Sequence, residues 1–310
     1  MAHDYPHHHH DGRHGADRGG YGRLFAAGIA LNLGFVIVEI WFGLKTGSLA
    51  LLADAAHNLG DVGGLVLAWA AWAAARLPAS EHKTYGWQRG SILASIVNAV
   101  VLLVAMGSLG WEAIGRLQDP SPVAAGTVMA VAAVGVVINT ATALLFMRGS
   151  QRDLNLRGAF LHMAADALVS LGVIIAGALY LWQGWTWIDP LAGIVIALVV
   201  IAGTWSLFRQ SLHLLFDGVP EHIDLQAVRA DLTTLPGVVA VHDLHVWAMS
   251  TAESALTAHL VCREDVVIGT VLREARLRLH RDFAIDHVTL QIEHDLCADH
   301  CDATLPHGQR

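Results

Sequence analysis

The sequence predicts an α-helical membrane protein with six transmembrane helices and a C-terminal cytoplasmic α+β domain. Of its 310 residues, 54% are hydrophobic and only 15% are charged, and the mean hydropathy is +0.48. This composition is too apolar for a soluble domain of this length. Six apolar stretches each contain the ~20 residues that are needed to cross ~30 Å of hydrocarbon. They lie near residues 23–44, 48–75, 88–115, 123–147, 157–182 and 187–209.

The chain divides into four predicted segments. Residues 1–22 are rich in Gly, Asp and His and contain almost nothing apolar, so we predict a disordered tail. The six-helix domain is predicted to cover residues 23–217 and the α+β domain residues 218–296. Residues 297–310 then form a C-terminal tail.

The pattern of apolar residues changes after the last apolar stretch. Gly218 and Pro220 break the helix, and two helical and three alternating segments follow in the order αββαβ. This order predicts a small, metallochaperone-like domain with both helices on one face of a sheet. The predicted elements lie at about 223–236, 238–249, 255–262, 265–283 and 284–294.

Basic residues are concentrated in alternate connections between the apolar stretches. The second and fourth connections with their flanks contain Arg76, Lys83 and Arg89, and Arg148, Arg152 and Arg157. The first contains only Lys45, the third only Arg116, and the fifth contains none. The positive-inside rule therefore predicts a multi-pass protein of the cytoplasmic membrane with both termini in the cytoplasm. A net charge of −8 and the lack of a P-loop argue against nucleic-acid and nucleotide partners.

Two copies of the pattern His-x-x-x-Asp lie within apolar stretches. His57 and Asp61 belong to the second stretch, and His162 and Asp166 belong to the fifth. On a helix, residues four apart share a face, so each copy projects an imidazole and a carboxylate in one direction. Two such helices facing each other would offer two nitrogens and two oxygens to a four-coordinate metal. The alternative is a hydrogen-bonded polar cluster between helices, which would not account for the matched spacing of such costly groups.

Two further polar residues accompany the first copy of this pattern. Asp54 precedes His57 by three residues and lies on a nearby helical face. It is either a fifth ligand or, as we favour, a structural residue beside a site that is already complete. Asn58 is one residue away from the ligand face and is expected to orient a neighbour.

The N-terminal tail contains a run of four histidines, His7, His8, His9 and His10. Clustered imidazoles on a flexible arm bind Zn²⁺ weakly and raise its local concentration. A solvated arm without a role and an expression tag are the alternatives, although other histidines around the run make a tag the less favoured one.

Several motifs together resemble the cation diffusion facilitator family, in particular its bacterial zinc, cadmium and cobalt efflux branch. The matching segments are Ser48–His57, His82–Arg89 and His242–Trp247. The resemblance implies a homodimer in the lipid bilayer that exports a divalent metal in exchange for protons. It assigns the transport site to both His-x-x-x-Asp pairs and implies an ion pair between Arg89 and Asp217.

The resemblance also implies a regulatory metal site in the cytoplasmic domain. Its implied ligands are His242, His259, Asp286 and Glu293, with Cys297 and Cys301 just beyond. His287 is an alternative to Asp286. A Cys-x-x-x-Cys pair in the reducing cytosol favours metal ligation over a disulfide bond. The alternative is that the histidines merely decorate the surface of a strand.

The expected function is proton-coupled efflux of zinc, a borderline-soft ion that accepts mixed nitrogen and oxygen ligands. Zn²⁺ is then both the transported substrate and a regulatory ligand, and the protein is a secondary transporter, not an enzyme. The same mechanism with Co²⁺ or Cd²⁺, and a membrane zinc sensor without transport, are the alternatives. An intramembrane metalloenzyme is disfavoured because a closed four-ligand site leaves no position for water.

Overall fold

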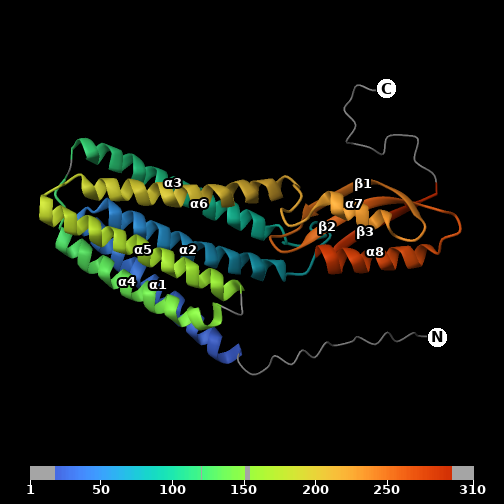
Figure 1. The fold of residues 1–310 in the computed structure, drawn as a ribbon, viewed down its shortest axis with the longest axis horizontal. Helices are drawn as coiled ribbons and strands as arrows, with labels where there is room; N and C mark the ends of the chain where they lie inside the picture. The colour runs from blue at the N-terminus through green and yellow to red at the C-terminus, as the bar shows by residue number, and fades with distance from the viewer. Residues whose placement is uncertain (1–17, 120, 151–153, 295–310) are drawn as a thin grey trace. The chain divides into compact units, whose positions relative to one another are not determined.

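A computed structural model describes residues 18–119, 121–150 and 154–294. It contains six long helices followed by a small domain of helices and strands (Figure 1). The long helices are α1 (Arg18–Thr46), α2 (Leu49–Ala75), α3 (Gly90–Gln118), α4 (Ala125–Ser150), α5 (Leu154–Gln183) and α6 (Ile188–Leu215). The chain forms two compact units, one built from residues up to 62 and 105–200, the other from 63–104 and 201 onward.

The six helices follow the six predicted apolar stretches, and the two largest differences lie at the start of α1 and the end of α6. α1 begins at Arg18, inside the predicted tail, because extending a helix adds one hydrogen bond for each residue fixed. α6 continues to Leu215, beyond the predicted end at residue 209. Among the described residues, four helices are long and apolar enough to cross a membrane. They are α3, the segment Ala125–Leu144 of α4, the segment Met163–Gln183 of α5, and α6.

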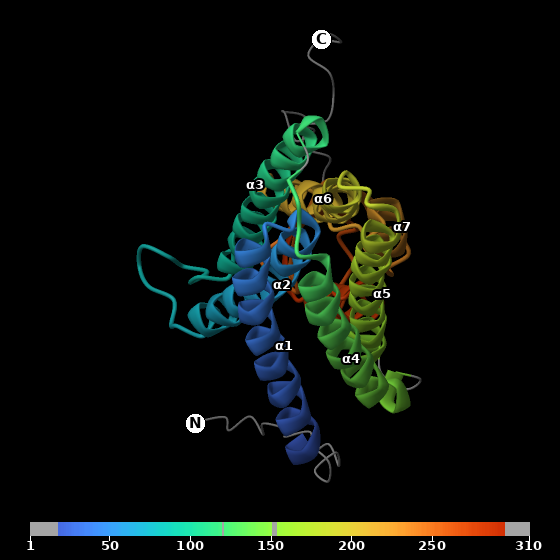
Figure 2. The same cartoon turned by 90° about the vertical axis from the view of Figure 1, so that its left-hand side faces the viewer.

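In the first unit, α4 and α5 run side by side and α1 packs against α4 (Figures 1 and 2). Gly135 makes this close approach possible, because a Cβ atom there would lie 2.5 Å from Phe35 Cζ and 3.1 Å from Ser170 Oγ. A Cβ atom at Gly177 would likewise lie 2.5 Å from Met129 Cγ. These two contacts fix an antiparallel register between α4 and α5.

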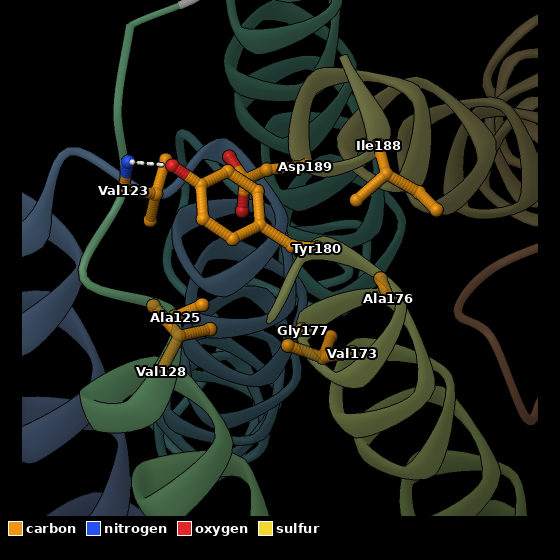
Figure 3. A pocket seen from close by; sticks show the side chains of 9 residues that line it. All are labelled: Val123, Ala125, Val128, Val173, Ala176, Gly177, Tyr180, Ile188 and Asp189. Carbon is orange, nitrogen blue, oxygen red and sulfur yellow. Dashed lines mark hydrogen bonds between the residues drawn. The ribbon is translucent and has the colours of Figure 1, made fainter. Parts of the chain in front are cut away.

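A buried carboxylate joins the start of α6 to the start of α2. Asp189 accepts hydrogen bonds from the Ser48 hydroxyl and from the Leu49 N–H, the latter at 2.8 Å. It also lines a small pocket, shown in Figure 3, in which the Val123 N–H donates to the Tyr180 hydroxyl at 3.3 Å. The other lining residues are apolar, so Asp189 is the only group in this pocket that could bind a metal. The pocket is therefore a structural feature and a poor candidate for a metal site.

The C-terminal domain confirms the predicted order αββαβ. Its elements are α7 (Leu225–Thr233), β1 (Val238–Ala248), β2 (Ser254–Cys262), α8 (Ile268–Phe283) and β3 (His287–Glu293). The sheet order is β1-β2-β3, in which β1 and β2 are antiparallel and β2 and β3 are parallel. The parallel pair requires a crossover, and α8 provides it.

Alternation along the strands separates the two faces of this sheet. One face forms the core with apolar residues of both helices, including Leu232 of α7 and Leu279 of α8, which are fully buried. Leu256 and Leu260 of β2 point into this core. His259 lies between them in sequence, so its side chain projects from the opposite face. His259 therefore lies on the face of the sheet opposite the helices.

Candidate metal sites

Three of the four predicted transport ligands lie together between α2 and α5. The His57 Nε2 atom is 3.7 Å from Asp61 Oδ2, one helical turn along α2, and 3.4 Å from Asp166 Oδ1 on α5. One ligand atom from each side chain lies within 4.8 Å of the other two. Asp166 is buried, and the other two side chains are partly buried.

The spacing of these atoms matches a tetrahedral metal site. Ligand atoms placed tetrahedrally at ~2.1 Å from a zinc ion are separated by roughly 3.4 Å. The two distances from His57 Nε2, 3.4 and 3.7 Å, are close to that value. Hydrogen-bonded nitrogen and oxygen atoms lie nearer, at about 2.9 Å. The three groups thus have the separation that a bound dication would require.

The fourth predicted ligand is His162, whose side chain lies outside the described residues. Its backbone belongs to α5, four residues before Asp166. Residues four apart on a helix share a face, so the backbone position agrees with the expected pair. Its participation in the cluster stays a prediction.

Asp54 lies next to this cluster in sequence but has other partners. Its Oδ2 atom accepts a hydrogen bond from Ser170 Oγ at 3.0 Å. Asn58 donates to Glu39 Oε2 at 3.1 Å, which places a polar layer across α1, α2 and α5. Asp54 does not belong to the described metal cluster, which favours the structural role over that of a fifth ligand.

Asn139 of α4 is a polar residue that the sequence reasoning missed. It is 1% exposed, and neither atom of its side-chain amide has a hydrogen-bond partner among the described residues. Gly135 lies beside Ser170, so one turn along each antiparallel helix brings Asn139 level with Asp166. An Asn in a largely apolar helix was the available signal.

A second cluster lies on the open face of the C-terminal sheet. His242 of β1 pairs directly with His259 of β2, and their rings meet edge to face at 5.1 Å. Glu293 of β3 contacts both, through Oε2 to His242 Nε2 and through Oε1 to His259 Nδ1, each at 2.9 Å. Three adjacent strands therefore supply two imidazoles and one carboxylate to one point.

The electrostatics of this second cluster favour an ionised carboxylate. Burial opposes the charge on Glu293, but hydrogen bonds from His242 and Gln291 outweigh it and lower the pKa of the Glu293 carboxyl below its ordinary value. Of the two contacts at 2.9 Å, the one between His242 Nε2 and Glu293 Oε2 is a hydrogen bond, whereas His259 Nδ1 has no hydrogen-bond partner among the described residues. A metal would replace this hydrogen bond and its proton.

The structure places two of the implied cytoplasmic ligands away from this cluster. Asp286 precedes β3 and accepts a hydrogen bond from His280 Nδ1 at 2.8 Å, and its alternative His287 meets Tyr85 edge to face. Asp243 of β1 lies beside the cluster instead, with its Oδ2 atom 3.5 Å from His259 Nε2.

Asp243 is the second residue that the sequence reasoning missed. It has a φ of 48° and lies in an irregularity of β1 between His242 and His245. Asp tolerates this left-handed conformation better than most residues. His245 donates to the other Asp243 oxygen, Oδ1, at 2.9 Å. A strand irregularity of this kind leaves no periodic signal in a sequence.

The remaining predictions divide into one observed contact and several untested positions. Arg89, next to the start of α3, forms the expected ion pair with Asp217, just after α6. Both side chains are more than half exposed at this contact. The other predicted ligands lie outside the described residues: His7, His8, His9, His10, Cys297 and Cys301.

Comparisons with known proteins agree with this two-part architecture. A family model described as the cation efflux transmembrane domain matches residues 25–216. A second model, the cytoplasmic domain of cation efflux proteins, matches residues 220–295. Both matches together cover the long helices and the αββαβ domain.

Curated relatives resemble the chain along most of its length. A cadmium, cobalt and zinc/H⁺-K⁺ antiporter of Bacillus subtilis is 34% identical over 285 residues, which are 90% of this chain and 91% of the relative. The metal cation efflux system protein CzcD of Cupriavidus metallidurans is 37% identical, over 89% of this chain and 87% of the relative. The zinc transporter ZitB of Escherichia coli is 36% identical, over 88% and 87%.

A solved structure of the metal-bound C-terminal domain of the CzcD transporter from Cupriavidus metallidurans also resembles the chain. The two sequences are 39% identical, and the match covers 23% of this chain and 99% of that chain, with a TM-score of 0.22.

The matches to both family models and to full-length relatives cover the transmembrane and the cytoplasmic part alike. The chain therefore belongs to the cation diffusion facilitator family of metal efflux transporters, in its zinc, cadmium and cobalt branch.

Proposed function

We propose that this protein exports Zn²⁺ from the cytoplasm in exchange for protons, through a site made of His57, Asp61, His162 and Asp166. The observation that carries the proposal is the cluster of His57, Asp61 and Asp166, whose atoms have the spacing of a tetrahedral metal site between apolar helices. Buried charges in a membrane are costly, and a bound dication would neutralise them. The names of the relatives support zinc as cargo.

Proton coupling follows from the chemistry of the ligands. A metal binds neutral imidazole and ionised carboxylate, so its arrival releases any protons on these groups. Once the site opens to the outer side, protons there compete for the same atoms and the metal leaves. The protonated site then returns to face the cytoplasm. No bond in the substrate is made or broken, so the protein acts as a secondary transporter and not as an enzyme.

The ligand set also limits the choice of metal. Two imidazoles with two carboxylates suit Zn²⁺, and Co²⁺ and Cd²⁺ remain the alternative cargoes, as the name of the Bacillus subtilis antiporter suggests. Mn²⁺ prefers a site made of oxygen atoms and is the poorest candidate among them.

The second cluster supports a regulatory role for the C-terminal domain. We propose that a zinc ion bound by His242, His259 and Glu293, with Asp243 or with Cys297 and Cys301 completing the site, favours transport in a homodimer. In this arrangement the C-terminal domain and both termini lie in the cytoplasm. The histidines of the tail, His7 to His10, would capture zinc before it reaches the transport site.

The proposal is tested by zinc uptake into inside-out vesicles under an imposed pH gradient. Wild type is expected to accumulate zinc, and Asp61→Ala is expected to lose uptake to the level of empty vesicles. Glu112→Gln is the matched control, because Glu112 is a half-exposed carboxylate on α3 that pairs with Arg116. Equal uptake by Asp61→Ala and wild type would contradict the proposal. Zinc binding without any uptake by wild type would instead favour the sensor.

A further inference from the structure

Two fully buried carboxyl groups lie outside the proposed metal ligands. Glu39 of α1 and Asp54 of α2 are both 0% exposed. Each accepts one hydrogen bond from an uncharged side chain on another helix: Glu39 from Asn58 at 3.1 Å, and Asp54 from Ser170 at 3.0 Å. Neither partner offers a positive charge, so the environment does little to stabilise two ionised carboxylates.

The remaining oxygen atoms of these two carboxyl groups lack donors. Glu39 Oε1 and Asp54 Oδ1 are buried and accept no hydrogen bond from any donor among the described residues. The side chains of Glu39 and Asp54 lie within hydrogen-bonding reach of each other. Two ionised carboxylates repel, whereas a carboxylic acid donates to a carboxylate. A single proton held between the two groups would relieve this repulsion.

The pair is close enough to the metal cluster to respond to its charge. His57 follows Asp54 by three residues on α2, and Asp166 precedes Ser170 by four residues on α5. Among the described residues, the imidazole of His57 and the carboxylate of Asp166 are the titratable groups that act on the pair from the helices around it. A dication held by His57 and Asp166 would repel a proton on the pair, and its departure would favour the return of that proton.

We propose that Glu39 and Asp54 form a proton-binding site separate from the metal ligands, and that its proton is exchanged for the transported dication. The proton leaves the Glu39–Asp54 pair as H⁺ to water when the metal binds, and it returns from water after the metal leaves. The inference rests on the proposed function, and it adds a carrier of the counter-ion that does not touch the metal.

The test compares wild type with Glu39→Gln in reconstituted vesicles. Glutamine keeps the size of the side chain and an oxygen that accepts from Asn58, but it cannot exchange a proton. We expect Glu39→Gln to bind zinc and to exchange zinc for zinc as wild type does. Uptake driven by a pH gradient should be slower than in wild type but remain above that of Asp61→Ala. The number of protons moved per zinc ion should fall by about one.

A second measurement is independent of transport. Infrared difference spectra of the metal-free protein should contain the carbonyl band of a protonated carboxyl group, and zinc addition should remove it. The band should be absent in Glu39→Gln and present in the Glu112→Gln control. Asp54→Asn, examined in the same way, covers the case in which Glu39→Gln fails to fold and bind zinc.

The results distinguish this inference from the proposed function. Loss of uptake in Asp61→Ala together with wild-type proton counts in Glu39→Gln or Asp54→Asn would overturn the inference alone. Loss of a bound metal ion, instead of a proton, in Glu39→Gln would overturn it as well. No uptake by wild type would contradict the proposed function, and the presence or absence of the infrared band would still decide the inference.

Discussion

The membrane cluster (His57, Asp61 and Asp166) and the sheet cluster (His242, His259 and Glu293) contain the same types of ligand at different spacings. In the membrane, His57 Nε2 lies 3.4 and 3.7 Å from the carboxylates of Asp166 and Asp61. In the C-terminal domain, Glu293 lies 2.9 Å from both His242 and His259. The first spacing is that of ligands around an ion, and in the second cluster His242 and Glu293 are joined by a hydrogen bond. A dication would enter the first site with little rearrangement, but it must break this hydrogen bond in the second.

The secondary-structure elements that position the two clusters also differ in how firmly they fix the ligands. Side chains on two helices form the membrane cluster, so a change in the separation of α2 and α5 moves Asp166 relative to His57 and Asp61. The sheet cluster lies on three hydrogen-bonded strands, whose register fixes His242 opposite His259. A transport site has to form and dissolve in each cycle, whereas a regulatory site has to persist while zinc is abundant. The two supports suit these two tasks.

The largest effect is expected from a single carboxylate of the membrane cluster. Asp166→Asn keeps the size of a buried side chain but removes a charge that balances the dication. We expect it to abolish zinc uptake into vesicles, because a loss of metal affinity by even ~3 kcal/mol lowers occupancy more than a hundredfold. Zinc binding to the sheet cluster should persist in this variant. Uptake near the wild-type rate would show that Asp166 is not a ligand.

The second-largest effect is expected from a substitution in the core of the C-terminal domain, which should destabilise this domain without affecting the transmembrane helices. Leu279 is fully buried in the C-terminal core, and Leu279→Ala is expected to destabilise that domain by about 2–5 kcal/mol. The measurement is hydrogen exchange in the full chain, in which β1 to β3 should lose protection while α4 and α5 keep theirs. Equal loss in both parts would show that the two regions unfold as one.

A smaller effect concerns the pH dependence of the sheet cluster. Because the pKa of Glu293 is below its ordinary value, its contribution to folding is present above the ordinary range for Glu and is lost as the pH falls through that range and below it. Glu293→Gln should remove this acid-side loss, which thermal unfolding of the metal-free protein between pH 3 and pH 7 would reveal (roughly the carboxyl titration range). It should also weaken zinc binding. The same acid-side slope in both proteins would contradict the assignment.

The smallest effect is expected at the exposed ion pair. Arg89 and Asp217 are both more than half exposed, and such pairs contribute about 0–1 kcal/mol. Arg89→Gln should therefore lower thermal stability only slightly and leave zinc affinity unchanged. The exchange of both charges, Arg89→Asp with Asp217→Arg, should restore the thermal stability of the wild type. A loss of transport that this exchange does not repair would assign Arg89 a role beyond the pair.

Local patterns predicted most of the helices, strands and ligand faces. The spacing of His57 and Asp61 places them on one helical face whatever surrounds them, and alternation places His259 on one face of a strand. Contacts between elements were harder to predict. Asp286 was chosen by resemblance, but β3 begins after it, and Asp243 reaches the cluster only through an irregularity in β1. The position of Asn139 depends on the register of α4 against α5.

The central claim is that an imidazole and carboxylates of α2 and α5 hold the transported ion. The most direct test is X-ray absorption spectroscopy of zinc bound to the full chain carrying His242→Ala, Glu293→Gln, Cys297→Ser and Cys301→Ser, which leave only the membrane site among the described clusters. The account predicts a four-coordinate zinc with nitrogen and oxygen ligands, which disappears when Asp166→Asn is added. Sulfur ligands, or the same spectrum and occupancy after Asp166→Asn, would contradict it.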